Sequence, residues 1–75
     1  MTPEIKRFDN NTFAFDMLKW RIENRYSRNK MALVTGVGTG YHYEQIESQK
    51  VQRPNIEVVF NACQLMGKNI NDYFK

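Results

Sequence analysis

One short stretch, residues 27–47, constrains the fold of this chain more than any other part. Its sequence, SRNKMALVTGVGTGYHYEQIE, predicts two short helices joined by a glycine-rich turn. Ser27 and Thr39 are N-cap residues, whose hydroxyls satisfy free amides at the start of a helix. Gly36 ends the first helix where a left-handed backbone is usual. A helix, a tight turn and a second helix form the unit that enters a DNA major groove.

The apolar residues of this stretch recur at helical spacing. Met31, Val34 and Thr35 give the first helix one face to bury. Tyr43 and Ile46 do the same for the second helix. The second helix is then left with four outward side chains: Tyr41, His42, Glu44 and Gln45.

The whole chain is predicted to be all-α, with five helices, because no segment alternates with period two for long enough to indicate a strand. Residues 1–11 are polar and are predicted to form an N-terminal arm, and residues 12–75 a single domain. A last short helix is expected over residues 70–74, capped by Asn69.

Apolar stripes predict the other two helices. In residues 13–26 the predicted buried stripe is Phe15, Leu18, Ile22 and Tyr26. Trp20 lies off this stripe, either half exposed or packed on the arm. Another helix should follow the loop of residues 48–55, with Asn55 as its cap and Gly67 at its end. Its predicted buried face is Ile56, Val59, Phe60, Cys63 and Met66.

Positive charge is concentrated around the two-helix stretch. Between Lys19 and Arg53 there are seven basic and three acidic residues, a net charge of +4. The rest of the chain has four basic and five acidic residues. Nucleic acid is the polyanion that such a patch commonly binds. Charge alone leaves an ordinary solvated surface open as the alternative.

Several classes of function find no support in the residues. Gly36, Gly38 and Gly40 follow no predicted strand and precede no Lys-Ser or Lys-Thr pair, so neither nucleotide-binding fingerprint is met. His42 is the only histidine and has no partner at ligand or triad spacing. Cys63 lies on an apolar stripe, where it is expected to be a small core residue. We therefore expect no enzyme, metal site, cofactor or small-molecule ligand.

The cysteine count and hydropathy indicate a compartment. A lone Cys63 cannot form an internal disulfide, which suits a reducing environment. No apolar run approaches the roughly 18 residues of a membrane span, and the N-terminus lacks a signal-peptide core. We expect a soluble, cytoplasmic protein with no membrane partner.

Residues 18–74 resemble the lambda-repressor-like, Cro-type helix-turn-helix proteins, also called the Xre family. Five features occur in the family's order. They are Arg21 six residues before the cap Ser27, Ala32 with Gly36, the segment Gln45-Ile46-Glu47, Pro54 with Gly67 thirteen residues later, and the closing NINDYF. Three features depart from the family's pattern: a turn, GVGTG, that is one residue longer, Ser48-Gln49 in place of Asn-Gly, and Gly40 where a long polar side chain is common.

The resemblance implies a sequence-specific DNA-binding regulator of transcription. It would be a small repressor of the kind found in phages and prophages, acting in the cytoplasm of a bacterial or phage-infected cell. Such proteins bind double-stranded DNA as homodimers on palindromic operators, with the third helix in the major groove. A second possibility stays open: a protein-interaction module on the same fold, similar to an antirepressor, without DNA binding of its own.

The resemblance also assigns residues to the DNA. Base contacts are expected from Tyr41, His42 and Gln45, although Tyr41 packed on the surface and a solvated Gln45 are the alternative. Phosphate contacts are expected from Arg28, Thr39, Gly40, Lys50, Gln52 and Arg53. An ion pair between Arg21 and Glu47 is expected, as in the family. If the turn were not one residue longer, His42 would face inward instead.

Overall fold

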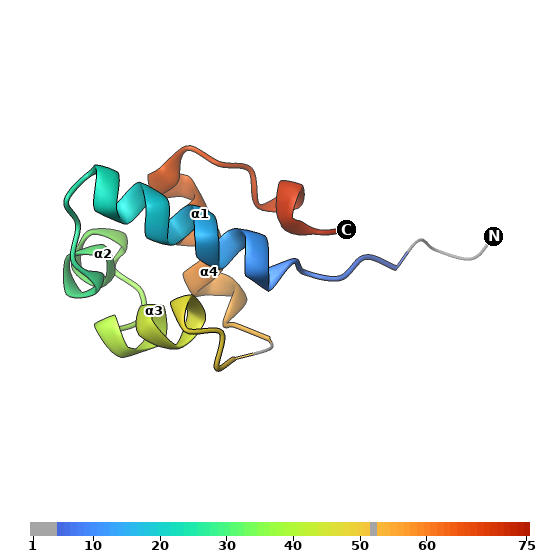
Figure 1. The fold of residues 1–75 in the computed structure, drawn as a ribbon, viewed down its shortest axis with the longest axis horizontal. Helices are drawn as coiled ribbons and strands as arrows, with labels where there is room; N and C mark the ends of the chain where they lie inside the picture. The colour runs from blue at the N-terminus through green and yellow to red at the C-terminus, as the bar shows by residue number, and fades with distance from the viewer. Residues whose placement is uncertain (1–4, 52) are drawn as a thin grey trace.

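The fold is all-helical, as a computed structural model that describes residues 5–51 and 53–75 shows (Figure 1). Its α-helices are α1 (Asn10–Glu23), α2 (Arg28–Thr35), α3 (Gly40–Glu47) and α4 (Ile56–Met66). A single 3-10 turn, η1 (Ile70–Tyr73), follows α4. The predicted all-α class is confirmed. None of the described helices is long and apolar enough to cross a bilayer.

The predicted fifth α-helix is not confirmed, because η1 has only four residues and ends one residue early, at Tyr73. Phe74 has an extended backbone and forms an isolated antiparallel bridge with Phe8. The backbones of Arg7 and Lys75 exchange two hydrogen bonds of 2.8 Å. This pairing holds the last residues extended, so the helix cannot continue through them.

Helix α1 begins at Asn10, within the run of capping residues 9–12 that indicates a helix start, and the Asp9 side chain caps it. Phe13, Ala14 and Met17 are its buried residues. The predicted stripe was wrong at Phe15, which is 65% exposed, and at Ile22, which is 63% exposed, whereas Tyr26 packs against the core. Apolar residues occur all round this helix, so helical spacing alone does not select the buried face.

Helix α4 has the predicted ends, with Asn55 accepting hydrogen bonds from two backbone amides and Gly67 at its C-cap. Its buried face differs in part from the prediction, since Ile56 is 56% exposed and Phe60 is 45% exposed. The residues that α4 buries are Val58, Val59, Ala62, Cys63 and Met66. The buried face is therefore offset from the predicted one by about one residue.

The central two-helix unit forms as the sequence predicts, apart from Val34, which is about half exposed. Ser27 caps α2 by accepting a 3.0 Å hydrogen bond from the Lys30 amide. Gly36 and Gly38 both have φ of 74°, a left-handed conformation that suits glycine and closes the turn. Met31 of α2 and the inward residues of α3 meet in the core.

The register of α3 is the predicted one, in which the turn is one residue longer. Tyr43 is fully buried and Ile46 is 2% exposed, whereas His42 faces out. The Tyr43 hydroxyl lies 2.9 Å from the Thr35 hydroxyl and donates to the Val37 carbonyl at 3.3 Å. This side chain therefore ties α3 to the end of α2 and to the turn between them.

An aromatic cluster closes the other end of the fold. The rings of Phe8 and Phe13 lie 5.5 Å apart, and the ring of Tyr73 lies 5.3 Å from that of Phe13. Tyr73 also donates a 2.9 Å hydrogen bond to Asp16. Trp20 does not reach this cluster. It packs edge-on against Tyr26, with a centroid distance of 4.9 Å.

We expect the charge of Asp9 to stabilise the folded state at neutral pH. Hydrogen bonds from the Thr12 hydroxyl (2.6 Å) and from the Lys75 ammonium (3.0 Å) lower the pKa of Asp9 from 3.8 to about 2. A lowered pKa contributes stability above pH 4 that is lost as the pH falls toward about 2. Asp9→Asn keeps a capping side chain without the charge. Thermal melting of both proteins should show a difference that closes between about pH 4 and pH 2. A difference that did not vary with pH would contradict this role.

Candidate nucleic-acid interface

The residues predicted to contact bases lie on the outward side of α3. Tyr41 is 65% exposed, His42 is exposed and Gln45 is half-buried. Tyr43 and Ile46 hold the opposite side of the helix in the core. The outward face is therefore carried by a short helix whose rotation is fixed by two buried anchors.

His42 has a structural role that the sequence reasoning did not assign. Its Nδ1 accepts a 3.0 Å hydrogen bond from the Thr39 backbone amide and lies 3.0 Å from the Thr39 hydroxyl. An acceptor at Nδ1 means that a neutral ring carries its proton on Nε2. Only the Nε2–H edge of His42 is then free to reach DNA. Thr39, predicted to contact a phosphate, has its amide and hydroxyl engaged by the same ring.

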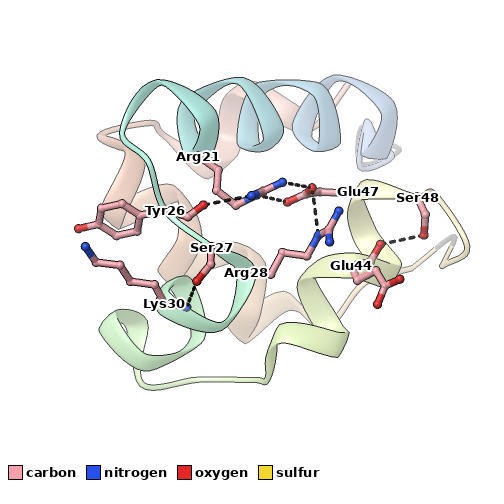
Figure 2. Close-up of polar contacts among 8 residues, drawn as sticks. All are labelled: Arg21, Tyr26, Ser27, Arg28, Lys30, Glu44, Glu47 and Ser48. Carbon is pink, nitrogen blue, oxygen red and sulfur yellow. Dashed lines mark hydrogen bonds and ion pairs between the residues drawn. The ribbon is translucent and has the colours of Figure 1, made fainter.

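The predicted ion pair between Arg21 and Glu47 is confirmed, and it is bidentate (Figure 2). Arg21 Nε lies 2.9 Å from Glu47 Oε2, and Arg21 Nη2 lies 3.0 Å from Oε1. The Glu47 side chain is only 4% exposed. Arg21 also donates to the Tyr26 carbonyl at 3.0 Å, so one guanidinium ties α1 to α3 and to the loop before α2.

Arg28 joins this pair, which the sequence reasoning missed. Its Nε lies 3.3 Å from Glu47 Oε1, while 43% of its side chain stays exposed (Figure 2). Only the closeness of α2 and α3 in the fold could reveal this contact, because the residues are nineteen positions apart. A phosphate bound by Arg28 would share the guanidinium with a buried carboxylate.

A polar hollow of about 400 Å³ lies where the start of α2 meets the start of α3. Ser27, Arg28 and Asn29 line it from α2, and Gly40 and Tyr41 line it from α3, with Arg21 and Glu44 also at its surface. A Cβ on Gly40 would collide with the Asn29 side chain. The Asn29 side chain would therefore have to move to admit a side chain at position 40, where α3 packs closely on the start of α2.

A basic loop follows α3 in the chain. Lys50 and Arg53 are both exposed, and Gln52, also predicted to contact a phosphate, lies outside the described residues. Gln49, near the start of this loop, has a left-handed conformation, φ 58°, at the position where the Cro-type proteins that the sequence resembles often have glycine. Arg28 and this loop therefore supply positive charge on both sides of the outward face of α3.

The remaining reactive groups of the described chain lie away from this face. Burial raises the pKa of the Cys63 thiol to about 11, so the thiol stays protonated and is a poor nucleophile. The described residues contain no group of three or more His, Cys, Asp or Glu side chains placed to hold a metal ion. The chemistry that the outward face of α3 offers is hydrogen bonding, apolar contact and positive charge.

Comparisons with protein-family models, with curated proteins and with solved structures found no match to this chain.

We expect Glu47 to be required for the stability of the fold. Glu47→Ala would leave the Arg21 guanidinium without its carboxylate partner beside the core, and breaking a buried pair in this way costs roughly 3 kcal/mol. Glu44→Ala is the matched control, because Glu44 is an exposed acid on the same helix. Chemical denaturation of both variants should show a large loss only for Glu47→Ala. If the Glu47→Ala and Glu44→Ala variants were equally stable, the ion pair would not be important for the fold.

Proposed function

We propose that this chain is a sequence-specific DNA-binding regulator of the Cro type, which inserts α3 into the major groove. One observation carries the proposal: a helix anchored by buried Tyr43 presents Tyr41, His42 and Gln45 outward, with cationic side chains on either side. DNA-binding proteins need both kinds of side chain. Those that contact phosphates set the position on the duplex, and those that contact bases read the sequence.

The size of α3 suits this role. An α-helix with its side chains is about 10–12 Å in diameter, and α3 has eight residues. The major groove is about 12 Å wide and accepts an α-helix. The glycine-containing turn before α3 and the basic loop after it would then lie near the two phosphate backbones.

In this proposal each outward side chain has its own chemistry. Gln45 can hold adenine by two hydrogen bonds, and the ring of Tyr41 can pack on a thymine methyl. The free Nε2–H of His42 can donate to a base acceptor or to a phosphate. Arg28, Lys50 and Arg53 would neutralise phosphates. Two copies of the chain would bind the halves of a palindromic site, and no catalytic step is involved.

A second candidate function is binding to a partner protein without DNA. Apolar side chains that DNA binding would not use favour it: Phe15 and Ile22 lie two turns apart on one exposed side of α1, and Leu33 of α2 is 82% exposed. Patches of this kind often mark protein contacts. Salt separates the two functions, because neutralising phosphates makes DNA binding weaken steeply as salt rises.

We expect Arg53→Ala and Arg28→Ala each to weaken binding to all DNA sequences alike. Removing one phosphate contact lowers the slope of log affinity against log salt by about one. Lys68→Ala is the control, because Lys68 follows α4 and lies outside the basic stretch. Gel shifts at several salt concentrations make the measurement. Failure of the wild-type chain to shift any DNA, together with salt-tolerant binding to a protein, would favour the second candidate.

Gln45→Ala should change which sequence is preferred. The loss of two hydrogen bonds to a base costs roughly 1–3 kcal/mol on the best site and relaxes the preference at one base pair of each half-site. Gln64→Ala, which changes an exposed glutamine of α4, is the matched control. Selection of bound sites from random DNA checks the outcome. The assignment is wrong if the preference at every position stays the same.

A further inference from the structure

A second hollow, mainly apolar, lies on the other side of α3 from Arg28. Its volume is about 180 Å³. Buried Ile46 and Val58 and half-buried Val51 and Pro54 supply its apolar surface, and Tyr41 and Gln45 reach it from α3. It is therefore continuous with the face proposed to read DNA bases.

The walls of this hollow are held in place by hydrogen bonds. Asn10 at the start of α1 donates a 2.9 Å hydrogen bond to the Val51 carbonyl, and the Lys50 amide donates to the Gln45 carbonyl at 3.0 Å. The Asn55 side chain, also at the hollow, is fixed by its bonds to the first amides of α4. A site held by three helices and their caps is pre-formed, which lowers the cost of binding.

The chemistry of the hollow selects its occupant. An apolar lining favours an apolar group, and an apolar cavity of about 150 Å³ already accepts a benzene-sized molecule. Thymine carries the one apolar group on the major-groove edges of the bases, its C5 methyl. Exposed Lys50 belongs to the same loop as the wall residues, next to Val51, and would draw the phosphate backbone toward the opening.

We propose that this hollow receives the C5 methyl group of a thymine, and that it thereby selects a T·A pair within one base pair of the position read by Gln45. This inference rests on the DNA binding proposed above. It adds Ile46, Val51, Pro54 and Val58 as specificity-determining residues, although none of them can hydrogen-bond to a base through its side chain. Burial of one methyl group corresponds to about a fourfold change in affinity.

The test uses the full chain and the best site selected from random DNA. Each thymine of one half-site is replaced in turn by deoxyuridine, which removes the methyl group and leaves base pairing intact. One replacement, within one base pair of the Gln45 position, should weaken binding about fourfold. Replacing that T·A pair with C·G should weaken binding further, and 5-methylcytosine should recover part of the loss.

Variants of Val51 test whether the methyl group enters this hollow. Val51→Phe fills the hollow and should remove the difference between thymine and deoxyuridine, and Val51→Ala, which removes packing volume without a clash, should reduce it. Val34→Phe is the matched control, because Val34 is a partly exposed valine of α2 that does not line the hollow. Melting curves establish that each variant is folded.

The outcomes separate this inference from the function on which it rests. Sequence-specific binding that no deoxyuridine weakens would overturn the inference and leave the proposed function intact. A deoxyuridine effect that stays the same in both Val51 variants would also overturn it, since the methyl group would then lie elsewhere. If the wild-type chain bound no DNA, the proposed function and this inference would both fail.

Discussion

The carboxylate of Glu47 is the contact on which the arrangement of the first three helices depends. It accepts two hydrogen bonds from Arg21 and one from Arg28, so it joins α1, α2 and α3 at one buried point (Figure 2). Apolar packing gives little direction at the ends of short helices, because it is roughly proportional to area. Bidentate pairing adds geometry, since a planar guanidinium meets a carboxylate in one orientation. This contact therefore sets the orientation of the outward face of α3 as much as the core does.

Side chains that look free for recognition also take part in the structure. His42 caps α3 through Thr39, and Arg28 is held by Glu47. The same is true of Gly40, whose missing side chain makes room for Asn29. Changing any of these residues alters the shape of the face as well as its chemistry. Gln45 and Lys50 are better probes of recognition, because no side-chain hydrogen bond or ion pair with another described residue was found for either.

The sequence predicted the two-helix unit well because its signals are local. Ser27, Gly36 and Thr39 mark helix ends through bonds within a few residues, and the spacing of Tyr43 and Ile46 set the register. The buried sides of α1 and α4 were partly mispredicted because each helix has apolar residues on more than one side. Which side is buried depends on neighbours that are distant in the chain. The bond between Arg28 and Glu47, and the hollow beside α3, arise only when separate helices come together. The extended end of the chain likewise depends on pairing with residues near its start.

The shared carboxylate changes what Arg28 can contribute to binding. A free arginine loses up to about 2 kcal/mol of side-chain entropy when it is ordered on a phosphate. The hydrogen bond from Arg28 Nε to Glu47 already restricts that freedom, and it does not use the two terminal nitrogens of the guanidinium. The same bond offsets part of the positive charge that attracts the phosphate, so the gain in long-range attraction is smaller than for Lys50 or Arg53. Arg28 is therefore suited to fixing the position of the duplex against α2, whereas the exposed loop on the other side of α3 supplies the attraction that brings DNA to the face.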